Sequence, residues 1–248
     1  MGGAVIETVE LSRRFGRRVA IDGVNLQVNS GSIFALVGPN GAGKTTTVKL
    51  LLNLLRPTGG RALVLGTDSR RLTPRDFARI GYVSENQQLP DWMTPEELIA
   101  WTRPFYPTWD DQLCRKLQDD LAIEPRTPLR VLSRGTRMKA ALLVSLAYRP
   151  ELIVLDEPFS GLDPLVRDEL IRALLELTGE YHWATLISSH DIDEVERLAD
   201  TIAFIENGRI LFTDSVQALI NQHRVPLRDI FVTLARRSRG RAAGSEAR

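Results

Sequence analysis

Residues Gly38 to Thr46 have the types and spacing of a phosphate-binding loop: a glycine, four residues, then Gly-Lys-Thr. Glycines let backbone N–H groups curl around phosphate oxygens, and a following helix N-terminus adds partial positive charge. The apolar run Ile33–Val37 precedes the loop and a helical pattern follows it, so a chance glycine-rich turn explains the segment poorly. The predicted nucleotide contacts are Gly38, Pro39, Asn40, Gly41, Ala42, Gly43, Lys44, Thr45 and Thr46, with Lys44 on the β- and γ-phosphates and the Thr45 hydroxyl on Mg²⁺.

Two acidic residues follow a second apolar run, Leu152–Leu155. Open α/β sheets place ligands at the carboxyl ends of their strands, so Asp156 is predicted to hold Mg²⁺ and Glu157 to polarise the attacking water. The alternative is a pair of acids that caps a surface turn. The guanine-recognition pattern Asn-Lys-x-Asp does not occur in the sequence, which favours an adenine nucleotide.

The elements that must position these residues can also be read from the sequence. Short apolar runs at 33–37, 152–155 and 184–188 alternate with helical patterns, which is typical of buried parallel strands. Asn207-Gly208 between two apolar runs predicts a hairpin. Thr94-Pro95 and Asp163-Pro164 predict helix starts, and residues 90–150 have mostly helical patterns. The pattern therefore predicts an α/β core that is interrupted by a helical insert.

Composition excludes several classes of protein. The 248 residues are 43% apolar and 25% charged, with a formal net charge of +1, which fits neither a disordered chain nor a strongly basic nucleic-acid binder. The single cysteine, Cys114, cannot form an internal disulfide and fits a reducing compartment. No apolar run approaches the roughly 18 residues of a membrane span, and Glu7 and Glu10 interrupt any signal sequence, so the chain is not expected to cross a membrane by itself.

The ordered set of motifs resembles the nucleotide-binding subunit of ABC transporters, from about Val5 to Leu219. The phosphate loop is its Walker A element, and residues 152–157 form its Walker B element. Residues 132–136, Leu-Ser-Arg-Gly-Thr, occupy the signature position, and residues 160–163 resemble the D-loop. His190 resembles the switch histidine, and residues 81–85 lie where the Q-loop begins.

This resemblance implies a fold and a division of the chain. The expected fold is α/β: a P-loop NTPase (RecA-like) core with an N-terminal antiparallel β subdomain and an inserted α-helical subdomain. The nucleotide-binding domain would be residues 1–223, with its core at 1–89 and 151–223 and the helical insert at 90–150. Residues 224–248 would form a C-terminal extension that ends in a basic tail, residues 235–248, in which five arginines accompany one glutamate.

The resemblance also implies roles for single residues. Ser133 is a natural N-cap, so the start of its helix is an anion site as well as a possible plain cap. In the family, Ser133 and Gly135 would face the ATP of a second subunit, and Asp163 of the D-loop would be a nucleotide-binding residue. His190 would contact the γ-phosphate and orient water, although an isolated histidine is more often structural. Phe15 would stack on adenine, with core packing as the alternative.

Two positions depart from the family pattern. Arg134 stands where the signature usually has glycine, and it would either pair across the dimer or be solvated. Glu85 replaces the usual Q-loop glutamine; it could still be a Mg²⁺ or water ligand but adds negative charge beside the metal. The alternative is a shifted alignment in which Gln87 or Gln88 takes the glutamine position. Both substitutions resemble a subgroup of ABC-2-type export ATPases.

The predicted function is therefore an ATP-hydrolysing subunit that uses ATP and Mg²⁺. It would dimerise with a second copy or a close paralogue, and would power a multi-span membrane permease, as an exporter, from the cytoplasmic face of the membrane. The alternative is a soluble ABC-type ATPase that acts as a regulatory or nucleic-acid-associated module. An aromatic group in the insert would either pack internally or contact the permease: Trp92, Trp101, Phe105, Tyr106 and Trp109. The basic tail would touch anionic lipid or have no lipid role.

Overall fold

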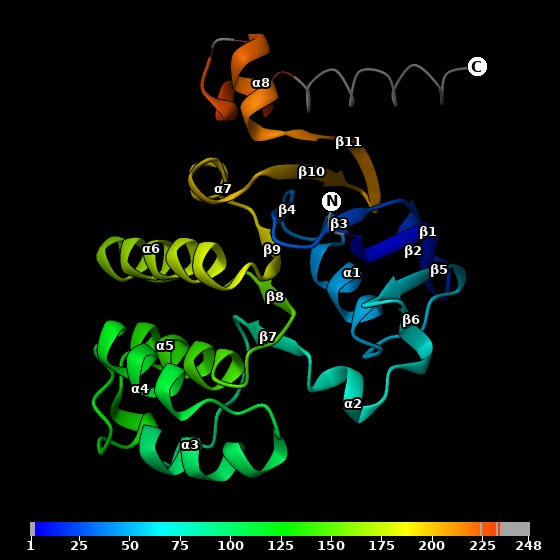
Figure 1. Ribbon diagram of the computed structural model, residues 1–248. Helices are drawn as coiled ribbons and strands as arrows, with labels where there is room; N and C mark the ends of the chain where they lie inside the picture. The colour runs from blue at the N-terminus through cyan, green and yellow to red at the C-terminus, as the bar shows by residue number, and fades with distance from the viewer. Residues whose placement is uncertain (1–2, 224, 232, 234–248) are drawn as a thin grey trace, which may run out of the picture.

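A six-stranded sheet lies at the centre of the computed structural model, which describes residues 3–223, 225–231 and 233 (Figure 1). The strand order is β11-β10-β4-β9-β8-β7, in which only β11 is antiparallel to its neighbour. The predicted buried strands and the hairpin at Asn207-Gly208 are confirmed. The strands are β4 (Ile33–Val37), β7 (Ile80–Ser84), β8 (Leu152–Asp156), β9 (Ala184–Ser189), β10 (Thr201–Glu206) and β11 (Arg209–Ser215).

An antiparallel sheet built mainly from the N-terminal residues packs beside the central sheet, as the expected fold requires. Its strands run in the order β2-β1-β5-β6, and β3 also pairs with β1. They are β1 (Ala4–Phe15), β2 (Arg18–Val24), β3 (Gln27–Asn29), β5 (Gly59–Val64) and β6 (Thr67–Asp68).

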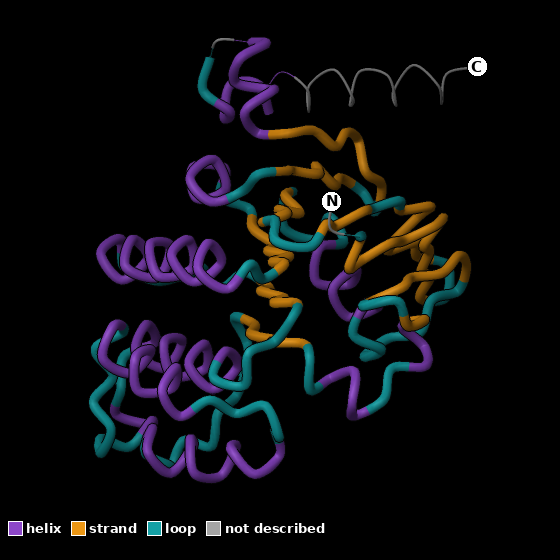
Figure 2. Tube along the Cα trace, in the orientation of Figure 1, coloured by secondary structure: helices purple, strands orange, loops and turns teal. Residues whose placement is uncertain are grey.

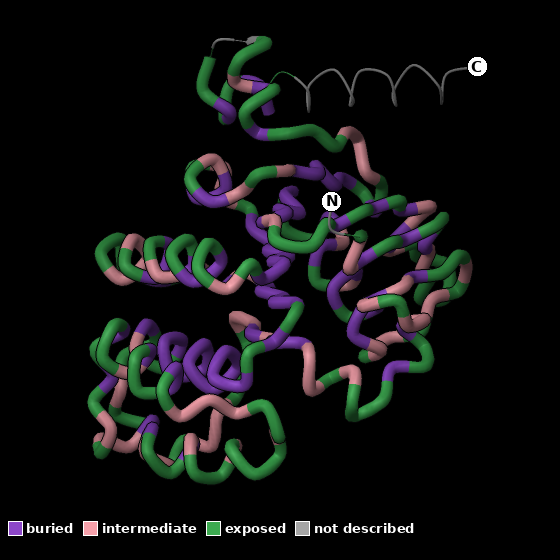
Figure 3. The backbone as a smooth tube through the Cα atoms, viewed as in Figure 1, coloured by how far each residue is buried: buried purple, intermediate pink, exposed green. Residues whose placement is uncertain are grey.

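The central sheet is buried on both faces, and the alternation of side chains along β4 shows what covers each face. Phe34 and Leu36 pack with α1 (Lys44–Leu51) and the antiparallel sheet. Ile33, Ala35 and Val37 pack into the second core, which includes residues of the helices on the opposite side. Figure 2 shows α1 on one side of the central strands and α5, α6 and α7 on the other. Figure 3 shows that β4, β8, β9 and β10 are almost entirely buried, whereas β11 at the edge is partly or fully exposed. The sheet is thus held rigidly between two layers.

The segment between β7 and β8 is helical, as the sequence predicts. Thr94 caps α3 (Pro95–Thr102) in a capping box with Glu97. The 3₁₀ turns Arg103–Phe105 and Leu129–Val131 separate α3, α4 (Asp111–Asp120) and α5 (Arg134–Leu146). The remaining helical elements are the 3₁₀ turn Ser69–Arg71, α2 (Pro74–Phe77), α6 (Pro164–Tyr181), α7 (Ile192–Leu198) and α8 (Val216–His223).

The aromatic residues of this helical segment separate into two groups. Tyr106 stacks on Tyr148 with ring centroids 3.8 Å apart, and Trp109 packs against the core, so internal packing accounts for both. Trp92, Trp101 and Phe105 are exposed. The basic tail lies outside the described residues. Within residues 3–223, 225–231 and 233, no helix has the length and apolar character that a bilayer span requires.

Candidate nucleotide site

Four neighbouring parallel strands bring the predicted chemistry to one edge of the central sheet. The phosphate loop follows β4, Glu157 follows β8, His190 follows β9 and Glu85 follows β7. The register aligns Val37 with Ser189, and Asp156 with Ser188 on one side and with Ser84 on the other. Segments that are far apart in the chain therefore end at the same level of the sheet.

Two glycines of the loop have no room for a side chain. A Cβ at Gly38 would lie 2.1 Å from the carbonyl oxygen of Ile205. Gly43 has φ +116°, and a Cβ there would lie 2.6 Å from the Ile21 side chain. The loop can therefore pack against β10 and β2 only because both positions are glycine.

The Lys44 ammonium lies inside the loop and is almost completely buried. It donates to the carbonyl oxygens of Gly38 and Pro39, at 2.6 and 3.2 Å, and forms an ion pair of 3.0 Å with Oε1 of Glu157. These contacts fix a positive charge beside the N-terminus of α1, where both the cation and the helix dipole attract anions.

Asp156 is buried at the end of β8 and joins three segments. Its Oδ1 accepts hydrogen bonds from Thr45 Oγ1 at 3.0 Å and from Ser188 Oγ at 2.6 Å. The carboxylate is thus fixed against the first turn of α1 by one hydroxyl and against β9 by the other.

Glu157 has a backbone conformation that non-glycine residues rarely adopt, with φ +54°. Its N–H donates to the carbonyl oxygen and to the hydroxyl of Ser188, both at 3.1 Å. Its Oε2 lies 2.7 Å from Nδ1 of His190 while Oε1 contacts Lys44. Left-handed backbone of this kind costs on the order of 1 kcal/mol or more and is concentrated at functional sites.

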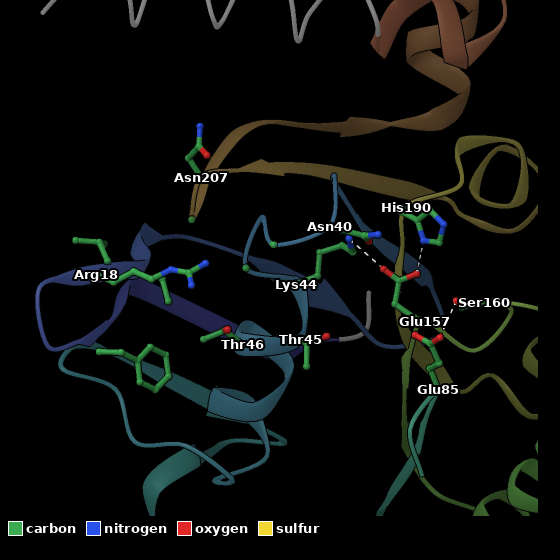
Figure 4. Close-up of a pocket in the computed structure, with 16 residues that line it drawn as sticks. Arg18, Asn40, Lys44, Thr45, Thr46, Glu85, Glu157, Ser160, His190 and Asn207 are labelled. Atoms are coloured by element: carbon green, nitrogen blue, oxygen red, sulfur yellow. Dashed lines mark hydrogen bonds and ion pairs between the residues drawn. The ribbon is translucent and has the colours of Figure 1, made fainter.

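Lys44, Thr45, Glu157 and His190 border a cavity of about 620 Å³ (Figure 4). Figure 4 shows Lys44, Glu157 and His190 together, with Arg18 and Asn207 further along the cavity. The predicted residues that line it are Phe15, Asn40, Gly41, Gly43, Lys44, Thr45, Thr46, Glu85, Glu157 and His190.

The other predicted residues do not line this cavity. Gly38, Pro39 and Ala42 belong to the loop without lining the cavity, and Asp156 is connected to the cavity through its hydrogen bond with Thr45. Ser133 caps α5, where its Oγ accepts from the Thr136 N–H at 3.1 Å, and Gly135 is buried against Val166. Asp163 caps α6. The residues predicted to meet a second subunit therefore lie apart from the cavity.

Some residues of the site were not predicted from the sequence. Arg18, Asn207 and Ser160 line the cavity, and Ser188 orients Asp156 and Glu157. Ser188 could have been predicted from the sequence, because it lies at the end of a predicted strand, two residues before His190. Arg18 begins β2 directly after a turn, and no motif marks it; the Asn207-Gly208 motif predicted a hairpin but not a place at the site.

Phe15 is half-exposed at the cavity and has one face already in contact. The Arg13 guanidinium carbon lies 4.5 Å from the centroid of its ring, a cation–π geometry. This arrangement holds the ring in place without burying it in the core.

The sequence suggested that Arg134 would either pair across a dimer or be solvated, and the structure shows that it also has partners within its own chain. Its Nη2 donates to Oε1 of Glu85 at 2.8 Å, and Ser160 Oγ donates to the same oxygen at 2.9 Å. Partial burial alone would raise the pKa of Glu85, but these hydrogen bonds more than offset it, so the pKa lies below its ordinary value.

Comparison with known proteins agrees with this geometry. The ABC transporter family matches residues 21–160. The chain is 34% identical to the probable sulfate/thiosulfate import ATP-binding protein CysA of Chlorella vulgaris, over 84% of this chain and 90% of the relative. It is 30% identical to the bacitracin transport ATP-binding protein BcrA of Bacillus licheniformis, over 84% and 68%.

The fold matches as well. A solved structure of an ATP-binding subunit of an ABC transporter superposes with a TM-score of 0.84 and 24% identity, over 93% of this chain and 99% of that one. The sequence matches, the fold and the site geometry together lead to one conclusion: the chain belongs to the ABC transporter family, as an ATP-binding subunit of the kind that hydrolyses ATP.

Proposed function

We propose that this subunit cleaves ATP with Glu157 as general base, and that two copies closing around ATP drive a separate membrane-spanning exporter. The observation that carries the proposal is the placement of Glu157, whose carboxylate is oriented by Lys44 on one oxygen and by His190 on the other. A base must be held within hydrogen-bond reach of the water that it activates, and its neighbours fix that position here.

The donor set fits Mg²⁺. Thr45 Oγ1 and Asp156 Oδ1 are hard oxygen donors 3.0 Å apart, and Mg²⁺ is commonly held by one or two such side chains together with phosphate oxygens. Thr45 and Asp156 would hold the ion, with Glu85 nearby at the cavity wall. When bound, the ion would neutralise charge on the β- and γ-phosphates.

The roles of His190 and Phe15 follow from their places at the cavity. The His190 ring, anchored through Nδ1, would orient the attacking water and contact the terminal phosphate. The Phe15 ring, steadied by Arg13, would stack on the adenine.

Dimerisation would use the second anion site. Ser133 is exposed at the N-terminus of the 13-residue helix α5, where its hydroxyl caps the Thr136 N–H and the helix dipole would attract a phosphate from another subunit. Asp163 would lie at the same interface.

The membrane partner would contact the helical insert, residues 90–150, which we propose as a lobe distinct from the core at 1–89 and 151–223. Trp92, Trp101 and Phe105 expose large apolar area there, and Trp101 and Phe105 pack edge to face against each other at the surface. The complex would then place this subunit at the cytoplasmic face of the membrane.

Export is proposed because Glu85 and Arg134 resemble the ABC-2-type export group, although the CysA relative is named for import. The direction can be tested with the purified complex in vesicles that carry the ATPase subunit outside. Cargo that stimulates hydrolysis from the outside, the ATP side, supports export. Stimulation only by cargo enclosed in the lumen would show import.

The transporter assignment itself is tested by purification of the tagged chain from its native membranes in mild detergent. We expect a multi-span membrane protein to copurify in stoichiometric amount. Recovery with ribosomes or DNA, without a membrane protein, would reject the transporter role and favour the regulatory alternative.

A further inference from the structure

The two residues that depart from the family pattern lie against each other. Arg134, 49 positions after Glu85, donates from Nη2 to Oε1 of Glu85 at 2.8 Å. The pair joins the loop after β7 to the first residue of α5. Neither substitution can therefore be interpreted alone, because each supplies the counter-charge of the other.

Arg134 occupies an unfavourable position for a cation within its own helix. The N-terminus of a helix carries partial positive charge, and the first turn of α5 contains no acidic residue. The guanidinium instead lies over the backbone of Gly161, where an added Cβ would be 2.7 Å from Nη1. Contacts outside α5, to Glu85 and Gly161, therefore set the position of the side chain.

Ser160 completes a three-residue cluster. Its hydroxyl donates to the same Glu85 oxygen at 2.9 Å. Glu85 and Ser160 both line the nucleotide cavity, whereas Arg134 lies behind them at the start of the signature helix. One carboxylate oxygen thus connects the cavity wall, residues 160–161 and α5.

The charge balance of the cavity gives this cluster a consequence for ATP. Two glutamates, Glu85 and Glu157, face a site for a polyanion, and Lys44 is paired with Glu157. An uncompensated Glu85 would repel the phosphates in a partly desolvated place, where charges interact more strongly than in bulk water. The side chains of Glu85 and Arg134 remain 30% and 44% exposed, so the effect is moderate.

We propose that Arg134 is a charge-compensating and positioning residue of the chain's own ATP site: it holds Glu85 so that a glutamate can line the cavity without repelling the triphosphate. The inference rests on the proposed nucleotide site and deepens it. It also connects the start of α5, the segment that would face a second subunit, to the cavity of the same chain.

The test is a mutational cycle read out by equilibrium binding of a non-hydrolysable ATP analogue, ADP, AMP and adenosine. We expect Arg134→Gln to weaken the affinity for the ATP analogue about tenfold, with a smaller effect on the affinity for AMP and little effect on that for uncharged adenosine. Glu85→Gln/Arg134→Gln should return within about threefold of wild-type affinity, and Arg134→Lys should retain most of it. If Arg134 had a purely structural role, the loss of affinity would not depend on the charge of the ligand.

The chain supplies a matched control in the exposed ion pair Arg79–Glu151, in which Nε and Oε1 are 2.6 Å apart. Arg79 directly precedes β7 and Glu151 directly precedes β8, so the pair lies at the ends of these strands that are far from the nucleotide cavity. Arg79→Gln changes the net charge equally and should leave nucleotide affinity unchanged. An unchanged affinity in Arg134→Gln, an equal loss for adenosine, or a double variant as weak as the single one would each overturn the inference. If wild-type protein did not bind the analogue, the nucleotide site itself would be rejected. Turnover by Glu157→Gln would reject only the general base.

Discussion

Nδ1 of His190 lies 2.7 Å from Oε2 of Glu157, although the two residues follow different strands of the central sheet. The contact depends on the parallel pairing of β8 and β9, and on Ser188, which binds the Glu157 N–H through both its carbonyl oxygen and its hydroxyl. Glu157 is consequently held in a fixed orientation before any reaction, which is what a general base requires.

Glu157→Gln should lower kcat by about 100-fold or more, because general-base catalysis typically contributes that much or more. Glutamine is nearly isosteric and should leave ATP binding largely intact. Steady-state hydrolysis and the ATP Kd measure the two effects separately. Glu151→Gln, at an exposed residue before β8, provides the control. A turnover close to that of wild type would remove Glu157 from the role of base.

Lys44→Ala should weaken ATP affinity by roughly 30-fold or more, because truncating one member of a buried charge pair typically costs about 2–5 kcal/mol. The ammonium has three partners within 3.2 Å, and Glu157 would lose its counter-ion. Lys49→Ala, at an exposed residue of the same helix, should bind ATP normally. Equal ATP Kd values for the two variants would contradict the predicted role of Lys44.

Asp156→Asn should shift the Mg²⁺ requirement of hydrolysis to higher concentration, because it removes the charged oxygen beside Thr45. Ser188→Ala should have a smaller effect, since Thr45 still holds the carboxylate. Titration of hydrolysis with Mg²⁺ at saturating ATP measures both shifts, and chelation of Mg²⁺ should stop wild-type turnover without unfolding the protein. An unaltered Mg²⁺ titration in Asp156→Asn would argue against this metal ligand.

Much of the fold could be predicted because its signals are local. The apolar runs, the phosphate loop and the caps of α3 and α6 each depend on a few consecutive residues. Contacts across the sheet could not be predicted in the same way. The Thr45–Asp156 hydrogen bond spans 111 positions and depends on strand order.

The pairing of Glu85 with Arg134 was missed for a related reason. It depends on how α5 packs relative to the end of β7, and no short sequence pattern encodes this packing. For the same reason, the two departures from the family pattern looked independent in the sequence.

Asp110 should make the stability of the helical segment depend on acid pH. Its carboxylate caps α4 by accepting from Gln112 and Leu113, and it pairs with Arg149 at 2.6 Å. The hydrogen bond from the Leu113 N–H, aided by Arg149, keeps the pKa of Asp110 below its ordinary value of 3.8 despite partial burial. Its stabilising contribution is therefore complete above the unfolded-state pKa and is lost as the pH falls through the lower folded-state pKa.

Asp110→Ala should accordingly cost about 1 kcal/mol of unfolding free energy at neutral pH. The difference in unfolding free energy between the variant and wild type should shrink as the pH falls below about 4, where the Asp110 carboxylate of the unfolded wild-type chain begins to be protonated. Urea unfolding at a series of pH values measures this difference. A gap that stays constant down to the lowest pH at which both proteins fold would show that the charge of Asp110 does not matter.

Ser133→Arg should prevent closure of the dimer while sparing ATP binding by the single chain. Ser133 is exposed and lies outside the nucleotide cavity of its own chain, so a bulky cation there should not disturb the local site. It would, however, fill the helix N-terminus that is proposed to receive the phosphate of a second subunit. Size-exclusion chromatography with ATP, in a Glu157→Gln background that prevents hydrolysis, should show dimers that the added Ser133→Arg change removes. Gln112→Arg adds the same side chain to the exposed start of α4 and should leave the dimer intact. A dimer that survives Ser133→Arg would place the interface elsewhere, whereas loss of ATP binding by the single chain would show that Ser133 serves its own cavity.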